Sequence, residues 1–162
     1  MAISTCSGFH INNCFCALAS GRQCKYSGQS VRALPTRIIT VGKKRSPGVQ
    51  LLVEEYIGKL KYYTSIDDIQ IRSNPKNARD DRAQVDDEDL AVMKLMTSDD
   101  WGASRLSFCI GGPYGHGQRI RKRANVSIRL SSMVLNHQIA LLVLIEQLYR
   151  SWTILKGQNY HH

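Results

Sequence analysis

A glycine-rich loop follows a short apolar segment in the last third of the chain. Residues 106–110 read Leu-Ser-Phe-Cys-Ile, and residues 111–115 read Gly-Gly-Pro-Tyr-Gly. Glycines at the carboxyl end of a strand let the backbone approach a ligand, at the usual binding edge of open α/β sheets. The loop is neither the GxGxxG dinucleotide fingerprint nor a P-loop, because no Gly-Lys-Ser/Thr follows. It therefore indicates another class of ligand site and disfavours an unrelated nucleotide-binding α/β enzyme.

Two later segments could contribute to the same site. Residues 128–137 read IRLSSMVLNH, a strand followed by an apolar loop that could hold an adenine while backbone groups bind its edge. An ordinary strand-to-helix connection would have the same pattern. Residues 146–152 read EQLYRSW, and residues 159–162 read NYHH. Considered alone, Tyr149 and Trp152 would be core aromatics and Arg150 a solvated charge.

Neither the cysteines nor the acidic residues form a metal-binding pattern. Four of the five cysteines lie before residue 25 without a CxxC pair, and Cys109 stands alone in an apolar strand. Cys109 is therefore expected to be a small buried hydrophobe. The acidic run over residues 80–89 could bind a divalent cation, but acids near a helix start more often stabilise the helix dipole. We predict no metal site.

The charge of the chain indicates a polyanionic partner. The 162 residues carry a net charge of +9, and 43% of them are hydrophobic, enough for one sizeable core. Residues 101–162 contain eight Lys and Arg residues against Glu146 alone. Because this excess lies in a segment that reads as folded, it favours a nucleic-acid partner. No apolar run approaches the roughly 18 residues needed to span a bilayer, so no membrane partner is expected.

The first 33 residues differ in composition from the rest. No Asp or Glu occurs before Glu54, and residues 1–33 are rich in Ser, Cys and Asn with a few basic positions. This composition is typical of an organellar transit peptide. It favours a chloroplast, with a mitochondrion as the alternative. We expect residues 1–33 to be removed or disordered, and residues 34–162 to form the folded domain.

Strand and helix patterns alternate through the folded part. β-branched and apolar runs predict strands at residues 37–41, 66–71, 106–110 and 126–130. Helical spacing of apolar residues predicts helices at 47–62, 78–96 and 118–124, and a long terminal helix to about residue 156 with Asn136 as its N-cap. The alternation predicts an α/β domain with a mainly parallel sheet and helices on both faces.

Four ordered motifs together resemble one family. They are the Ile-Gly-Gly-Pro-x-Gly loop, the Leu-Ser-x-Met-x-Leu-x-His stretch, the Glu-Gln-Leu-Tyr-Arg-x-Trp helix and the Tyr-His end. The chain resembles the RlmH-type SPOUT RNA methyltransferases, closely over its last third and more loosely over residues 39–43. The resemblance implies a SPOUT-type α/β knot with a C-terminal trefoil, an exception to the rule that chains avoid knots. It also implies a homodimer that uses S-adenosyl-L-methionine to methylate a pseudouridine in 23S-type ribosomal RNA of the large subunit.

The resemblance also implies roles for individual residues. Cofactor binding falls to Gly112, Ser131, Ser132, Met133, Val134, Leu135 and Asn136, where the last position is usually Pro. Positions near the cofactor or the RNA, from which a catalytic group would come, are His137, Arg150, Tyr160 and His161. Phosphate contacts are expected from two basic clusters, whose alternative is a solvated face: Lys43, Lys44, Arg45, Arg119, Arg121, Lys122 and Arg123.

One departure from the family lies between Trp101 and Gly102. Relatives have a strand and a helix there, with a Leu-Asp-Glu-x-Gly motif, and roughly 25 residues by usual element lengths are missing from this chain. The missing strand would occupy a central sheet position and form one wall of the cofactor pocket. The alternative function is therefore a non-catalytic RNA-binding or dimerisation module of the same family, disabled by this loss.

Overall fold

The computed structural model describes residues 2–6, 31–97 and 104–158, and the account that follows concerns these residues. Their strands form one sheet in the order β3-β2-β4-β1-β5. The strands span β1 Ala2–Cys6, β2 Thr36–Gly42, β3 Ile66–Arg72, β4 Leu106–Ile110 and β5 Val126–Arg129. The helices span α1 Pro47–Leu60, α2 Asp81–Thr97, α3 Gln118–Arg123 and α4 His137–Leu155.

The strand β2 lies at the centre of a parallel unit. It pairs with β3 from Thr36 opposite Ile66 to Gly42 opposite Arg72, and with β4 on its other side. All seven residues of β2 are buried. A β-branched run buried on both faces is what a parallel strand covered by helices requires. The predicted parallel core of the domain is thereby confirmed.

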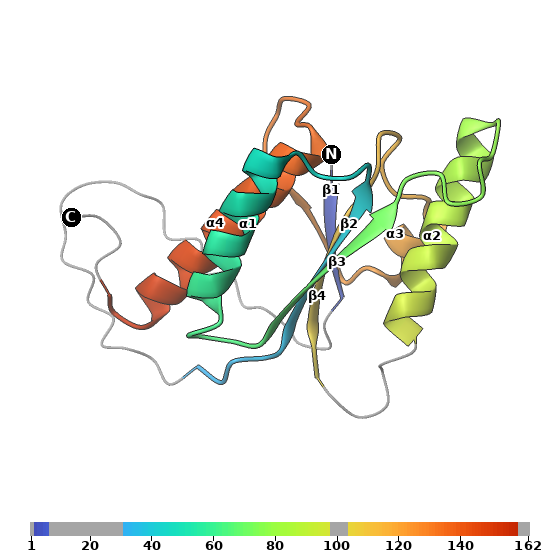
Figure 1. Ribbon diagram of the computed structural model, residues 1–162. Coiled ribbons are helices and arrows are strands. Elements are labelled where there is room, and N and C mark those ends of the chain that lie inside the picture. The colour runs from blue at the N-terminus through green and yellow to red at the C-terminus, as the bar shows by residue number, and fades with distance from the viewer. Residues whose placement is uncertain (1, 7–30, 98–103, 159–162) are drawn as a thin grey trace.

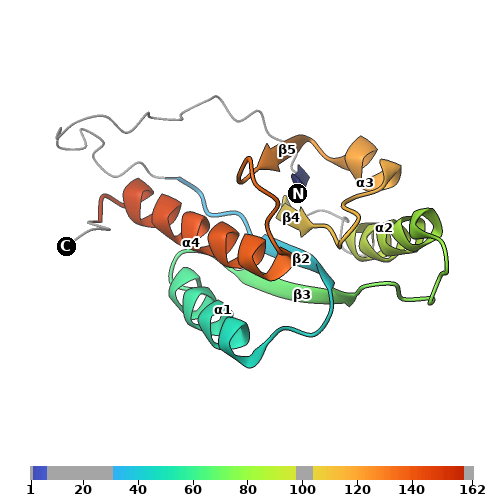
Figure 2. The ribbon, with the colours of Figure 1, turned by 90° about the horizontal axis from the view of Figure 1, so that it is seen from above.

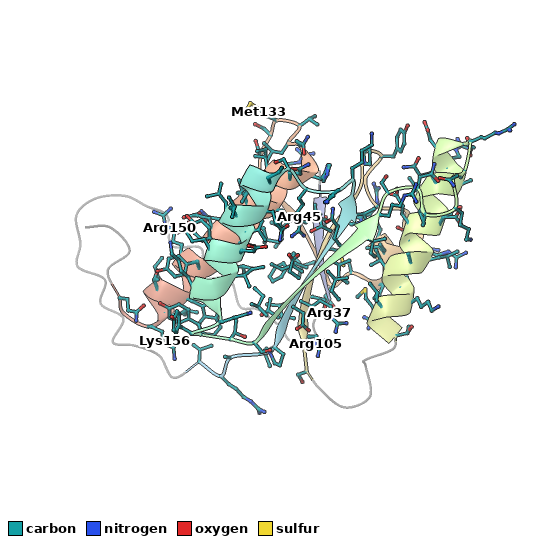
Figure 3. The ribbon with its side chains drawn as sticks, viewed as in Figure 1. Arg37, Arg45, Arg105, Met133, Arg150 and Lys156 are labelled. Carbon is teal, nitrogen blue, oxygen red and sulfur yellow. The ribbon has the colours of Figure 1, made fainter. Side chains whose placement is uncertain are left out.

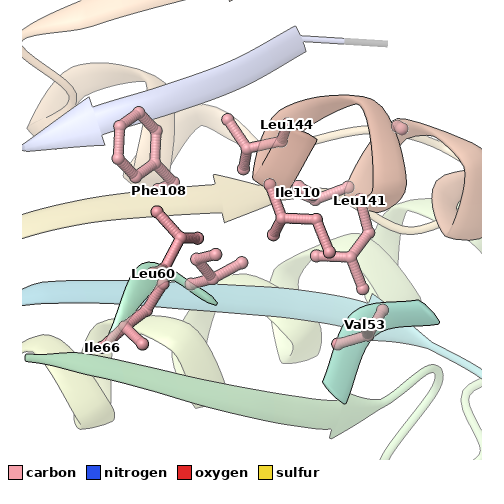
Figure 4. Close-up of a cluster of buried hydrophobic side chains, with 10 residues drawn as sticks. Val53, Leu60, Ile66, Phe108, Ile110, Leu141 and Leu144 are labelled. Carbon is pink, nitrogen blue, oxygen red and sulfur yellow. The ribbon is translucent and has the colours of Figure 1, made fainter. Parts of the chain in front are cut away.

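Helices cover both faces of the sheet (Figures 1 and 2). The pair α1 and α4 lies on one face, and the pair α2 and α3 lies on the other. Under α1 and α4 a larger core forms, which includes Val53, Phe108 and Leu141 (Figure 4). A smaller core under α2 and α3 includes Ile39, Val92 and Cys109, so the expectation that Cys109 is buried is confirmed.

The helix boundaries follow local sequence signals. Ser46 is extended before α1 and Pro47 is the first helical residue, a position where the missing N–H of proline costs nothing. The Asn136 side chain accepts a hydrogen bond from the Gln138 backbone N–H at 2.9 Å, which confirms it as the N-cap of α4. All four predicted helices are present within a few residues of their expected ends.

The side of the sheet formed by β1 and β5 is antiparallel, although a mainly parallel sheet was expected. The strand β1 runs antiparallel to both of its neighbours, with Ile3 opposite Ile110 of β4 and opposite Ile128 of β5. Five residues of the expected leader thus lie inside the sheet, in the gap between β4 and β5. The rest of that leader up to residue 30, and the junction at Trp101 and Gly102, lie outside the described residues.

Candidate functional site

The glycine loop after β4 is a tight turn that needs its glycines. Gly115 donates its backbone N–H to the Gly112 carbonyl at 3.0 Å and has a φ of +81°. A Cβ at Gly111 would lie 2.8 Å from the Gly115 carbonyl carbon. A side chain is therefore disfavoured at Gly111 by steric contact and at Gly115 by the backbone conformation. The turn is fixed further by a 3.0 Å contact between His116 Nε2 and the Cys109 carbonyl oxygen.

A buried carboxylate lies directly behind this loop. Glu88 of α2 is 3% exposed, and its Oε1 accepts hydrogen bonds from the Ser73 hydroxyl, the Asn74 backbone N–H and the Gln84 side chain at 2.8 to 2.9 Å. Its Oε2 has no hydrogen-bond partner. A Cβ at Gly112 would lie 2.8 Å from that Oε2. Glu88 therefore links the loop after β3 to the expected cofactor loop after β4.

The neighbouring carboxylate, Asp89, anchors α3. It is 1% exposed and accepts hydrogen bonds from the backbone N–H groups of Gly117, Arg119 and Ile120 at 3.0 to 3.3 Å. A carboxylate from another helix thus satisfies the free donors at the start of α3. Both acids belong to the run over residues 80–89 that was expected to stabilise the helix dipole, and that interpretation was wrong for these two, because they are buried and accept hydrogen bonds from other segments.

A sequence signal for the two buried acids did exist. Val85, Val92 and Met96 predict the buried face of α2, and positions 88 and 89 fall on that same face at helical spacing. Carboxylates that interrupt an apolar stripe are buried only when donors meet them. Which donors would do so was not visible, because Ser73, Asn74 and Gly117 are distant in the sequence.

The loop at residues 131–136 approaches from the far side of β4. The Ser131 hydroxyl accepts a hydrogen bond from the Met133 backbone N–H at 3.0 Å. Met133 is 71% exposed and Val134 is 94% exposed, and Figure 3 shows Met133 at the outer tip of the loop. Of the remaining expected cofactor residues, Ser132 is exposed and Leu135 is partly buried. Met133 and Val134, two of the apolar side chains expected to enclose an adenine, are therefore exposed to solvent, and no described element covers them. Leu135 packs against the larger core instead.

His137 lies where this loop meets the parallel strands. A Cβ at Gly42 would lie 2.6 Å from His137 Nε2, so only glycine fits opposite the ring. That Nε2 is buried and has no hydrogen-bond partner. Burial lowers the pKa of His137, and the nearby Arg45 guanidinium lowers this pKa further. The imidazole is therefore neutral at pH 7, with a nitrogen at the carboxyl end of β2.

Arg150, the one other expected catalytic position among the described residues, is not brought together with His137. Arg150 lies 13 residues further along α4, which is roughly 20 Å at the helical rise per residue. Figure 3 shows Arg150 well removed from Met133. Tyr160 and His161 lie outside the described residues. Within a single copy of the chain, Arg150 is therefore too far from His137 to belong to the same site.

The expected RNA-binding residues divide into two groups. Lys43 and Lys44 are exposed, as are the basic residues of α3. Arg45 is different, since it is 7% exposed and its two terminal nitrogens bind the Asp68 carboxylate at 2.5 and 2.7 Å. This bidentate pair holds the loop after β2 against β3. Arg45 is thus a structural residue, contrary to the expectation that it faces RNA.

A cleft of about 800 Å³ opens at the carboxyl ends of β2, β3 and β4. It is lined by basic, amide and aromatic side chains together with loop backbone: Gly42, Lys43, Lys44, Gln70, Arg72, Ser73, Asn74, Asn77, Gln84, Pro113 and Tyr114. No group of three potential metal ligands lies together in the described part of the chain. A helix long and apolar enough to cross a membrane is likewise absent from the described residues.

A parallel α/β sheet with a glycine loop and an open cleft at its carboxyl edge defines the class of α/β enzymes that bind their ligands there. A family described as "Predicted SPOUT methyltransferase" matches residues 93–161. A protein of Arabidopsis thaliana named "Putative RNA methyltransferase" is 58% identical, with all of both chains covered. Proteins named ribosomal RNA large subunit methyltransferase H are 35% identical in Geotalea daltonii and 34% in Thermus thermophilus, covering 78% and 77% of this chain and 98% and 96% of theirs.

The chain belongs to the SPOUT methyltransferase family. Its alignment with the Arabidopsis protein runs over 193 positions, whereas this chain has 162 residues. At least 31 of those positions therefore have no counterpart here. This difference agrees in size with the loss of a strand and a helix that the sequence analysis expects.

Proposed function

We propose that this protein transfers a methyl group from S-adenosyl-L-methionine to a pseudouridine of large-subunit ribosomal RNA. The observation that carries the proposal is the tight glycine turn at the end of β4, with the buried Glu88 directly behind it, in a chain that belongs to a methyltransferase family. The names of the bacterial relatives, which specify the large ribosomal subunit, support the substrate class. The net charge of +9 suits a polyanionic partner.

The residues at the site fit the cofactor in part. The backbone at Gly111 and Gly112 is free of side chains on the ligand edge of the sheet, and residues 131–136 supply apolar side chains and a second stretch of backbone. When bound, the cofactor supplies a methyl group already activated by its sulfonium. The protein must therefore orient the two reactants and bind the deprotonated target nitrogen.

The chain's own groups suggest how the proton is handled. His137 has a buried nitrogen without a hydrogen-bond partner at the carboxyl end of β2, which makes it one candidate for accepting the proton. His161, Tyr160 and Arg150 stay candidates for the same role or for RNA contact. Arg150 reaches the site only if a second copy of the chain supplies it.

A homodimer is accordingly part of the proposal. Large apolar side chains are exposed on the two helices of one face, with Leu51 68% and Leu52 45% exposed on α1, and Ile139 46% and Ile154 48% exposed on α4. Exposed apolar groups on adjacent helices are typical of a subunit interface. We also propose that the C-terminal part of this chain forms the trefoil knot implied by the family resemblance.

We also propose a chloroplast location, with a mitochondrion as the alternative, on the composition of residues 1–33. The placement of β1 gives this proposal a structural consequence. Removal of the leader would take away the strand that fills the gap between β4 and β5.

A specific observation also favours the second candidate, a non-catalytic RNA-binding or dimerisation module. The exposure of Met133 and Val134 leaves the expected adenine pocket without an opposite wall in the described residues. The missing strand and helix would have provided that wall. In this case the chain binds RNA or a second copy of itself but not the cofactor.

The experiment that tests the proposal is a calorimetric titration of the full chain with S-adenosyl-L-methionine. It is followed by incubation with ribosomes that lack the modification and methyl-labelled cofactor. Saturable micromolar binding and label in the large-subunit RNA are the expected results. A folded chain that binds no cofactor would overturn the proposal in favour of the non-catalytic module.

Gly112 is a poor position for a variant that tests cofactor binding. A side chain there would meet Glu88 at 2.8 Å and disturb the loop itself, so lost binding would not report on the ligand. Val134→Asp is a better test variant, because Val134 is 94% exposed and contributes little to folding. It should weaken cofactor binding without changing the melting temperature.

A further inference from the structure

We infer that the cleft at the ends of β2, β3 and β4 is a subsite for a single unstacked nucleotide of the RNA, with cationic groups for its phosphates and Tyr114 as the stacking surface for its base. The inference rests on the proposed function and deepens it. It assigns the substrate a place on the outer side of the glycine loop after β4, separate from residues 131–136, the second segment expected to bind the cofactor.

The size and charge of the cleft suit a ligand that carries phosphate groups. A volume of about 800 Å³ lies within the usual range for small-ligand pockets, about 300–1,000 Å³. Lys43, Lys44 and Arg72 line it, and all three are exposed with no ion-pair partner in the described part of the chain. No Asp or Glu is among its lining residues. Three unpaired cations around one opening form a site for phosphate groups.

An aromatic ring lies at the rim of the cleft. Tyr114 is 52% exposed in the turn between Gly112 and Gly115, so its ring is held on a rigid backbone. The nearby Asp81 carboxylate, at the start of α2, raises the pKa of Tyr114. An exposed aromatic ring beside cationic groups is the usual platform for single-stranded nucleic acid.

The floor of the cleft is held in place by the protein's own hydrogen bonds. Asn74 and Asn77 adopt left-handed backbone conformations, with φ of 50° and 56°. The Asn74 side chain closes a ring with the Ala78 backbone through hydrogen bonds of 2.7 and 2.9 Å. Below it, Glu88 holds the backbone of Asn74 and the Gln84 side chain. A loop fixed by a buried carboxylate costs little further ordering when a ligand binds.

Two carboxylates, Glu88 and Asp81, lie near this subsite. Neither lines the opening, where it would repel a phosphate. Three donors compensate Glu88 on its Oε1, and the residue is buried beneath the lining. Asp81 interacts with the Tyr114 hydroxyl at the rim. The amides of Asn77 and Gln84 also line the cleft, where they suit the polar edge of a base.

The test is fluorescence anisotropy of the full chain with a fluorescein-labelled single-stranded 12-nucleotide oligouridylate over a range of salt concentrations. The triple variant Lys43→Gln, Lys44→Gln, Arg72→Gln should lose about 30-fold in affinity. The slope of log affinity against log salt should fall by about 2, since each single-strand phosphate contact contributes about 0.7. Lys61→Gln is the matched control, because Lys61 is exposed at the opposite end of α1 and should change affinity less than twofold.

Variants of Tyr114 test the stacking surface separately. Tyr114→Ala should weaken binding about tenfold, whereas Tyr114→Phe keeps the ring and should bind like the wild type. Photocrosslinking with 5-iodouridine in the same oligonucleotide should place the modified peptide at Tyr114. Unchanged melting temperatures would show that the variants fold.

The outcomes separate this inference from the proposed function. If the wild type binds the RNA and the cleft variants bind it equally well, the nucleotide subsite is wrong and the methyltransferase proposal stands. If the wild type binds no RNA, the subsite and the RNA substrate are both wrong, and the calorimetric titration still decides cofactor binding. Loss in the triple variant and in Tyr114→Ala, with Tyr114→Phe intact, supports the subsite.

Discussion

The two sides of the sheet are held together in different ways. On one side, β3, β2 and β4 are parallel, and β2 is buried along its whole length under helices on both faces. On the other side, β1 and β5 are antiparallel, and three of the four residues of β5 are exposed. The parallel side is held by packed helices and by the hydrogen bonds of buried carboxylates. The outer strand β5 is held mainly by backbone pairing with β1.

This difference bears on function because each side carries part of the site. The substrate cleft and His137 lie at the ends of the parallel strands, where Glu88 and the Arg45–Asp68 pair fix the loops. The exposed loop at residues 131–136 follows β5, on the weakly packed side. We therefore expect the cleft and the glycine loop after β4 to be more rigid than the loop at residues 131–136.

The largest expected effect comes from the centre of the parallel side. Ile38→Ala removes a fully buried side chain from the larger core and should lower the free energy of unfolding by about 3–4 kcal/mol. Val126→Ala on β5, where the side chain is 45% exposed, should cost only about 0.5 kcal/mol. Urea denaturation of both variants measures the contrast, and equal losses would contradict it.

The next effect concerns the support of α3. Asp89→Ala leaves three backbone N–H groups without their acceptor and should cost about 2–3 kcal/mol, measured by thermal unfolding. Asp86→Ala, exposed on the same helix, should stay within about 0.5 kcal/mol of the wild type. An equal cost for the two variants would mean that Asp89 is not the anchor of α3.

A smaller and more local effect should follow deletion of residues 1–30. Each backbone hydrogen bond of β1 contributes roughly 1 kcal/mol, and ordering each residue costs a similar amount, so the net change should be within about 2 kcal/mol. Hydrogen exchange should show β5 losing protection at least tenfold while β2 and β3 keep theirs. If β2 lost protection equally, the two sides of the sheet would be one cooperative unit.

The smallest effect is the pH dependence due to His137. Burial lowers its pKa in the folded state, so between that value and 6.5 the unfolded chain binds more protons. The stability that this group contributes is therefore complete above about pH 6.5 and is lost as the pH falls. His137→Gln should lose less stability than the wild type between pH 7 and 5. Parallel curves for the two proteins would remove His137 as the cause.

Much of the fold follows from local patterns in the sequence. Residues 106–110 form a strand at the predicted positions, and Asn136 caps α4, because apolar periodicity and capping chemistry depend on near neighbours. The glycine turn was identified for the same reason. By contrast, the strand β1 was not predicted, since pairing with β4 and β5 involves residues about 100 positions away.

The sequence by itself determined the family, the glycine loop, the basic charge and the order of elements on the parallel side, because each depends on residue type and short spacing. Only the tertiary structure decided that Arg45 binds Asp68, that Glu88 and Asp89 are buried, and that Arg72 and Tyr114 share a cleft with Lys43. The physical reason is that burial and charge pairing depend on which distant groups meet, and one-dimensional patterns do not contain that information.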